Sequence, residues 1–269
     1  EEAPWRNRWD WALFIGGFAP SLIFGVAVGN VLQGVPFRIE EDMQIFYDGS
    51  FFGLLNPFAL LCGLVSVAML VMHGAAWLQV KTSGAVAERA RRFGITAALA
   101  VPALYLAAGA VLAFFLPGYV ITSEISTSGV SNPLLKHAVV QNGAWLANYA
   151  AHPVLWLVPG LGLAGTVIAA LCMAARRPLA ALITGGAGIA GIITSVGVSM
   201  FPFILPSSAN PSASLTVWDA SSSHLTLFIM LISTLIFMPI ILAYTSWVFS
   251  VLRGKVDAEA IENGKEHAY

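Results

Sequence analysis

Six stretches of this sequence are apolar over lengths that can cross a lipid bilayer. They cover residues 11–35, 51–78, 93–116, 154–175, 179–205 and 225–252. A membrane-spanning helix needs about 20 such residues, and in lipid the backbone polar groups must be satisfied within the protein. Spanning β-strands would be about half as long and would alternate in polarity. The sequence therefore predicts an all-α integral membrane protein with six transmembrane helices, in which residues 1–269 form a single transmembrane domain.

The composition supports this class of protein. Hydrophobic residues make up 58% of the chain and charged residues 10%, whereas soluble domains carry about 25% charged residues. The formal net charge of −1 argues against a nucleic-acid partner, because binding to a phosphate backbone needs an excess of basic residues. We therefore expect the chain to be in contact with membrane lipid and to have no nucleic-acid partner.

The basic residues predict the orientation of the six helices. Four clusters fall on the same side of a six-helix topology: Arg6 with Arg8; Lys81, Arg89, Arg91 and Arg92; Arg176 with Arg177; and Arg253 with Lys255. The positive-inside rule makes that side cytoplasmic. The opposite connections hold six acids, with Arg38 and Lys136 as their only bases. These longer connections contain several prolines, so we expect structure beyond helix packing on the outer side.

Two residue types indicate how the helices sit in lipid. The run 179–205 contains Gly188 and Gly191 among other small residues. Such residues let membrane helices approach closely, which we favour over a phosphate-binding loop. Trp145, Trp156 and Trp218 fall at or near the predicted outer side, where we expect them to belong to an interfacial aromatic belt.

No acid or histidine is predicted at the middle of an apolar run. The histidines fall near the ends of the runs or in polar segments, although haem ligation by His152 and His224 near the outer surface is an alternative. Asp48 and Asp219 precede helices, where a carboxylate favours the positive helix N-terminus. A hydrolase triad, a metal cluster and a nucleotide loop are all missing from the sequence.

Four segments together resemble a known family. Residues 201–227 form a specific polar loop with Trp218 and Asp219, FPFILPSSANPSASLTVWDASSSHLTL. Residues 47–84 read YDGSFFGLLNPFALLCGLVSVAMLVMHGAAWLQVKTSG and contain Asn56 and Pro57, while residues 34–37 read GVPF and residues 5–11 read WRNRWDW. In content and order they resemble subunit II of cytochrome bd-type quinol oxidases, from residue 5 to about residue 252.

The resemblance implies a subunit of a respiratory enzyme in the bacterial inner membrane. The expected partner is a homologous subunit I, which forms a heterodimer with subunit II and carries haem b and haem d. The complex oxidises quinol, reduces dioxygen to water and separates charge without pumping. No catalytic, cofactor-binding or metal-ligating residue is assigned to this chain. The resemblance offers Trp218, Asp219, Asn56 and Pro57 as structural motif residues, and leaves open a bound quinone and a small accessory subunit.

The family also implies a larger architecture than six helices. Its members are expected to have nine spans, in two four-helix bundles and one peripheral helix. We therefore expect three N-terminal spans to be absent from this sequence, together with a Trp-Asp-Gly-Asn-Gln segment whose acid is implicated in proton supply. The missing start methionine agrees with this. The first run would then complete the first bundle, the second to fifth would form the second bundle, and the sixth would be the peripheral helix.

Two other functions remain open on the residues alone. A stand-alone transporter or channel would favour polar residues or broken helices at mid-membrane in both halves of the chain. The prolines permit breaks, but the two halves lack matching motifs. A non-catalytic, quinone-binding structural subunit is the second alternative, because apolar grooves with Trp and Phe suit an isoprenoid tail.

Overall fold

Six long helices dominate the computed structural model, which describes residues 3–124, 131–251 and 254–255. The last residue of the run 225–252 and Arg253 of the fourth basic cluster lie outside the described residues. The long helices are α1 (Ala3–Gln33), α2 (Pro57–Lys81), α3 (Gly84–Phe114), α5 (Leu157–Ala174), α6 (Pro178–Met200) and α7 (His224–Val251). Each is long and apolar enough to cross a membrane, α5 together with the short helix before it. The all-α membrane fold with six transmembrane helices is confirmed.

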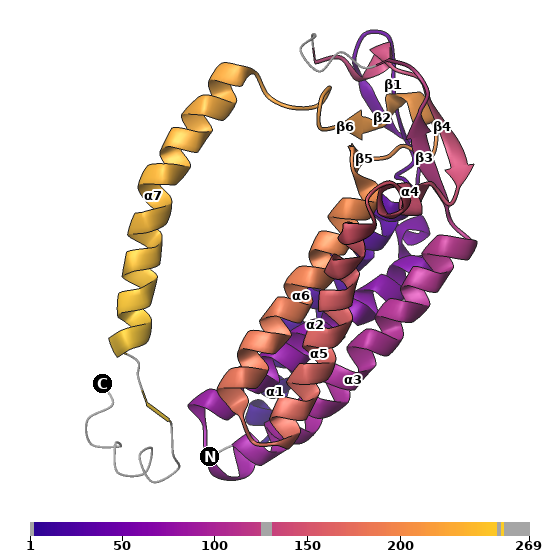
Figure 1. Cartoon of the computed structure of the whole chain (residues 1–269). Coiled ribbons are helices and arrows are strands. Elements are labelled where there is room, and N and C mark those ends of the chain that lie inside the picture. Colours follow the sequence, from indigo (N-terminus) through magenta and orange to yellow (C-terminus); the bar gives the residue numbers. More distant parts are fainter. Residues whose placement is uncertain (1–2, 125–130, 252–253, 256–269) are drawn as a thin grey trace.

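Helices α2, α3, α5 and α6 pack into a four-helix bundle (Figure 1). Its core consists of small and flexible side chains: Met72, Ala76, Ala97, Ala98, Ala169, Ala170, Met173 and Ala181. Glycines bring α5 and α6 together, because a Cβ added at Gly188 would lie 2.8 Å from the backbone nitrogen of Thr166. Close approach through small residues is what stabilises helix pairs where lipid leaves no hydrophobic driving force.

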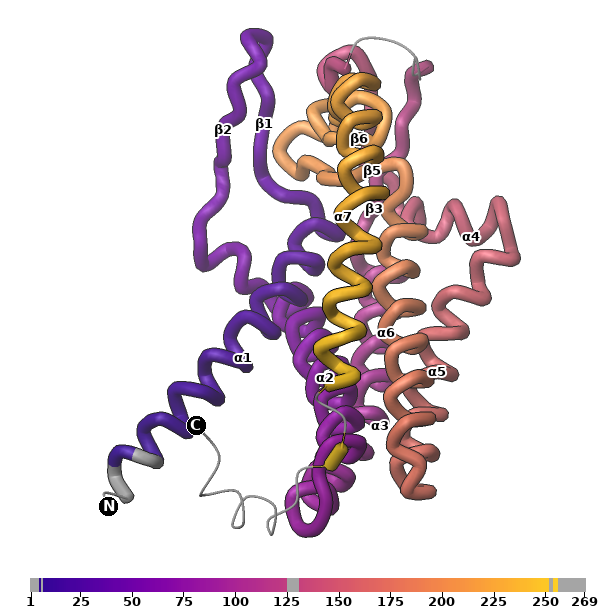
Figure 2. Tube along the Cα trace, turned by 90° about the vertical axis from the view of Figure 1, so that its left-hand side faces the viewer, coloured from indigo at the N-terminus to yellow at the C-terminus, as the bar shows by residue number. Residues whose placement is uncertain are grey.

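Helices α1 and α7 lie outside this bundle. A Cβ added at Gly29 of α1 would lie 2.7 Å from the Cα of Ala59, so α1 packs tightly on the start of α2. Towards its N-terminus α1 tilts away from the bundle (Figure 2). None of the residues of α7, all of which the structure describes, is buried. Its Phe249 ring lies 5.6 Å from the ring of Trp77 on α2, and the rest of α7 stands apart from the bundle (Figure 1).

The long connections gather at one end of the helices, in a region that we call the cap: the described residues of 34–56, 115–156 and 201–223 (Figure 1). Three two-stranded antiparallel sheets lie here, β1 (Phe37–Ile39) with β2 (Ile45–Tyr47), β3 (Pro117–Ile121) with β4 (Ala138–Asn142), and β5 (Phe203–Leu205) with β6 (Leu215–Thr216). The cap also holds η1 (Phe52–Leu55), η2 (Pro133–Leu135), η3 (Ala144–Leu146), α4 (Ala147–Ala151), η4 (Pro153–Trp156) and η5 (Pro211–Ala213). Sequence reasoning missed these strands, because they are too short to give a period-two pattern.

The helix ends differ from the predicted ends for local reasons. The run 179–205 was expected to be helical throughout, but α6 ends at Met200 and residues 203–205 form β5. Pro202 and Pro206 flank that strand, and the residue before a proline avoids helical geometry. Helix α3 begins at Gly84 instead of residue 93, because Glu88 pairs with Arg91 and Arg92 one turn further along the helix.

The opposite end of the bundle carries the basic clusters. The start of α1, the α2–α3 turn and the α5–α6 turn are all at this end of the molecule, and we call it the basic end (Figure 1). The segregation agrees with the predicted orientation, in which the basic end faces the cytoplasm and the cap faces outwards.

Candidate functional site

The cap contains a buried ion pair. The Nζ of Lys136 lies 2.7 Å from Oδ2 of Asp219, and the two side chains are only 4% and 9% exposed. Lys136 also donates to the carbonyl of Pro133 at 2.9 Å, and the other carboxylate oxygen of Asp219 accepts from the Thr216 N–H at 2.8 Å. A buried charge must be paired and hydrogen-bonded to be tolerated. The pair therefore holds two connections of the cap against each other.

Asp219 was expected to be a structural residue of its loop and to favour the start of the next helix. The structure supports the first role by geometry, since Asp219 fixes the loop through Lys136 and Thr216. It does not place the carboxylate at a helix start, because α7 begins only at His224 and the Ser223 hydroxyl accepts from the Thr226 N–H. Asp48 differs from the expectation in the same way, because it lies 3.5 Å from Arg38.

The segment around Ser207 joins the loop 201–223 to the first connection. Val35 N–H donates to the Pro206 carbonyl at 2.9 Å, and Ser208 N–H donates to the Val35 carbonyl at 3.1 Å. The buried Ser207 hydroxyl donates to the Phe37 carbonyl, and Ser207 N–H donates to the hydroxyl of Ser214 at 2.9 Å. The serines of this loop therefore satisfy buried backbone groups.

Trp218 is half-buried beside the ion pair. Its ring meets that of Phe201 edge-on at 5.8 Å, so it ties the loop to the end of α6. Trp145, which we expected at the membrane interface, is instead 2% exposed inside the cap. It packs 5.7 Å from the Tyr119 ring, within a cluster that includes Phe58 and Phe203. Trp145 lies in η3, a turn that the sequence pattern did not indicate.

Asn56 and Pro57 begin α2. Pro57 occupies the first turn, where a missing N–H costs nothing. The Asn56 side chain accepts from the Ala59 N–H at 2.9 Å and donates to the Asn30 side chain of α1 at 3.2 Å. Asn30 in turn donates to the Leu54 carbonyl at 2.7 Å. One amide side chain thus caps α2 and joins it to α1.

A buried hydroxyl cluster lies where the cap meets the bundle. The hydroxyls of Tyr105 and Ser195 are 2.7 Å apart, and the Tyr149 hydroxyl donates to the Ser195 carbonyl at 2.8 Å. Burial raises the pKa of Tyr149, and a hydrogen bond to Ser199 opposes the shift. These contacts fix α3 and α4 to α6, and sequence reasoning did not single them out because the two tyrosines lie in different elements.

The histidines lie in separate places. His152 follows α4, and His224 opens α7. His73 lies well inside α2 and is half-buried, and its Nδ1 has no hydrogen-bond partner among the described residues. Over residues 3–124, 131–251 and 254–255, no group of three His, Cys, Asp or Glu side chains could hold a metal ion.

Comparisons with known proteins agree with the motif resemblance. The family model for cytochrome bd terminal oxidase subunit II matches residues 1–252. A probable cytochrome oxidase subunit 2 of Haemophilus influenzae is 46% identical over 98% of this chain and 70% of its own length. The cytochrome bd-I ubiquinol oxidase subunit 2 of Escherichia coli strain K12 is 42% identical over 100% of this chain and 71% of its own length. The family expected from the sequence motifs is confirmed: this chain belongs to the cytochrome bd terminal oxidase subunit II family.

Proposed function

We propose that this chain is subunit II of a respiratory terminal oxidase that oxidises quinol and reduces dioxygen to water. The observation that carries the proposal is the family match over residues 1–252. It is supported by the Escherichia coli relative, which is a subunit of a ubiquinol oxidase and is similar over the whole of this chain.

The proposed reaction takes place in a complex with a homologous subunit I. Two quinols give up four electrons and release four protons, and one dioxygen takes up four electrons and four protons to form two waters. If the released protons leave on the cap side and the consumed protons enter from the basic end, charge is separated without a pump. We assign haem b and haem d, which would carry the electrons, to subunit I.

The chain itself is a multi-pass protein of the bacterial inner membrane, as the family and its six apolar helices show. Within the complex we assign it a supporting role. The cap is held rigid by the Lys136–Asp219 pair and by the Ser207 contacts, and the bundle is held by close glycine packing. We also propose that residues 1–269 form one transmembrane domain, since the cap is built from the connections between the helices.

Co-purification with subunit I tests the proposal. A tag on this chain should recover subunit I, haem absorption bands and quinol-dependent oxygen uptake, whereas the chain expressed without subunit I should bring down no haem. A deletion of subunit I is the control for haem carried by other proteins. Haem bands of full intensity from the chain alone would overturn the assignment of the cofactors. Purification of this chain without subunit I or oxidase activity, from cells that express both subunits, would overturn the proposed function.

A further inference from the structure

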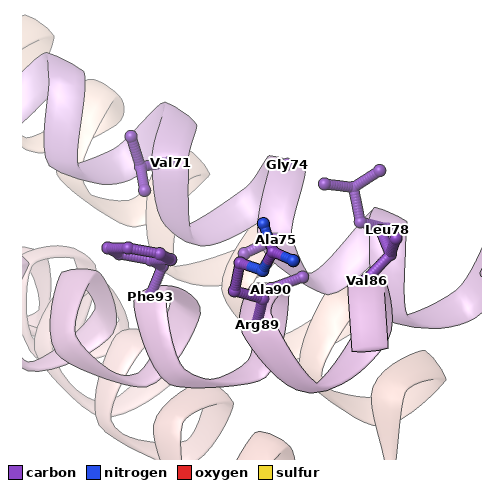
Figure 3. Close-up of a pocket in the computed structure, with 8 residues that line it drawn as sticks. All are labelled: Val71, Gly74, Ala75, Leu78, Val86, Arg89, Ala90 and Phe93. Carbon is purple, nitrogen blue, oxygen red and sulfur yellow. The ribbon is translucent and has the colours of Figure 1, made fainter. Parts of the chain in front are cut away.

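Helices α2 and α3 form a groove near the basic end of the bundle. Its volume is about 430 Å³, and it is lined by Val71, Gly74, Ala75, Leu78, Val86, Arg89, Ala90 and Phe93. The small residues Gly74, Ala75 and Ala90 leave space between the larger apolar side chains (Figure 3). A Cβ added at Gly74 would meet nothing within 4 Å, so this part of the groove is open.

Arg89 is the one charged side chain that lines the groove. It extends from α3 towards Gly74 and Ala75 of α2 (Figure 3). Gly74 lies seven residues before Lys81, the last residue of α2, which is roughly 10 Å along the helix axis. If the end of α2 marks the membrane surface at the basic end, as the predicted orientation implies, the guanidinium group faces the boundary between the lipid headgroups and the acyl chains.

Three arginines at the basic end share one acid, and Arg89 is not among them. Glu88 binds Arg91 at 2.6 Å, Arg92 at 3.5 Å and Arg176 at 3.8 Å. In the described part of the chain, the Arg89 side chain has no hydrogen-bond or ion-pair partner. A cation at membrane depth is costly unless it is paired, and a guanidinium fits a phosphate in bidentate geometry. The groove therefore has a free site for an anion beside a free site for a hydrocarbon chain.

We propose that this groove binds an anionic phospholipid of the leaflet at the basic end. The phosphate group pairs with Arg89, and one acyl chain lies over Gly74 and Ala75 between Val71 and Phe93. Charge complementarity favours an anionic lipid over an uncharged occupant. The apolar floor of the groove lies next to Arg89, a cation without an anion among the described residues. The proposed lipid site is formed by α2 and α3 alone and does not depend on the oxidase reaction.

Photocrosslinking in vesicles tests the proposal on the purified oxidase complex. The probes are phosphatidylglycerol and phosphatidylethanolamine analogues that carry a diazirine in the acyl chain, and crosslinks are mapped by peptide mass spectrometry. We expect phosphatidylglycerol to label residues 71–93 more strongly than phosphatidylethanolamine does. Arg89→Gln should lower the phosphatidylglycerol label about tenfold, since it removes a charge-assisted hydrogen-bonded contact between the guanidinium and the phosphate.

Two further variants separate a site from general surface charge. Arg177→Gln removes the same charge at the same end of the bundle, outside the groove, and should leave the label unchanged. Gly74→Leu adds a side chain whose Cβ would meet nothing within 4 Å; it occupies the open floor and should lower the label from both lipids. Equal labelling in all variants, or an equal loss in Arg89→Gln and Arg177→Gln, would overturn the proposal. Loss of subunit I from the Gly74→Leu complex would also overturn it, because a protein helix would then occupy the groove.

Discussion

The Nζ of Lys136 and the Oδ2 of Asp219 lie 2.7 Å apart, and both side chains are almost fully withdrawn from solvent. Lys136 follows η2 in the connection after α3, and Asp219 lies in the connection before α7. Asp219 also accepts a hydrogen bond from the Thr216 N–H of its own loop. The carboxylate therefore fixes the fold of this loop and, through Lys136, its position against the connection after α3. The stability of the cap therefore depends on both partners.

Asp219→Asn should destabilise the cap strongly while leaving oxygen chemistry intact in the assembled complex. The substitution leaves Lys136 buried without its counter-charge, which costs about 3–5 kcal/mol. Asp48→Asn is the matched control, because the side chains of the Arg38–Asp48 pair are 50% and 43% exposed and such a pair contributes about 0–1 kcal/mol. Thermal unfolding and limited proteolysis of the purified complex measure the difference.

The double variant Lys136→Met with Asp219→Leu should recover much of the stability that Asp219→Asn loses. Replacing both members of a buried pair by apolar residues removes the desolvation cost as well as the attraction. A double variant that unfolds at the temperature of Asp219→Asn would contradict this. An Asp219→Asn complex that unfolds like the wild type but no longer turns over would show that the carboxylate has a chemical role.

Gly188→Leu should disrupt the contact between α5 and α6. The new side chain would start 2.8 Å from the Thr166 backbone nitrogen and 3.1 Å from the Gly165 carbonyl carbon. Backbone atoms cannot move aside as a flexible side chain can. We therefore expect the free energy of unfolding to fall by about 3 kcal/mol, the upper end of the usual cost of overpacking. Gly197→Leu, on the same helix with nothing within 4 Å, is the control. The same unfolding temperature for both variants would contradict the packing role.

Asn56→Ala should weaken the junction of α1 with α2. The change removes the cap on the Ala59 N–H and the donor to Asn30, and the lost cap alone costs about 0.5–2 kcal/mol. Ser83→Ala is the control, because Ser83 precedes α3 without a side-chain capping bond. Hydrogen exchange at the start of α2 should rise in Asn56→Ala and stay unchanged in Ser83→Ala. Faster exchange in both variants would mean that the cap at Asn56 is not the cause.

The stability of the cap should fall at alkaline pH through Tyr119. Burial raises the pKa of Tyr119, so the native cap holds the phenol proton more tightly than the unfolded chain does. This contribution is fully present below the unfolded pKa of about 10 and is lost as the pH rises through the raised native pKa.

Tyr119→Phe is the variant that isolates this effect. At neutral pH it should be less stable by about 1 kcal/mol, because the hydrogen bond to the Gln33 carbonyl is lost. Above pH 10 the advantage of the wild type should shrink, since the phenylalanine cannot ionise. Unfolding temperatures of the two proteins from pH 7 to pH 11 give the comparison. A constant difference over that range would show that Tyr119 is not responsible for any alkaline loss.

The helices were predictable because, in lipid, every backbone N–H and C=O of a long apolar segment must be hydrogen-bonded within the protein, which a helix achieves. The sequence also separates the basic end from the cap, and the run of glycines in α6 indicates a packing face that the structure shows against α5. The cap was not predictable in this way. By its position in the sequence Trp145 is expected at the membrane interface, but it is buried beside Tyr119, since Phe58 and Phe203 from distant parts of the chain belong to the same buried cluster.

Lys136 and Asp219 illustrate the same limit. Lys136 is the one lysine in the outer connections, which hold six acids, and this indicates that it could form an ion pair. The sequence does not say which acid it binds. Hydropathy and charge by themselves determined the six helices, their predicted orientation and, through motifs, the family, because these properties depend on local composition. Only the tertiary structure decided that Asp219 meets Lys136, that Asn56 joins α1 to α2, and that Arg89, unlike Arg91, Arg92 and Arg176, has no anion among the described residues. Those relationships depend on distances between residues far apart in the chain, which packing sets and composition does not.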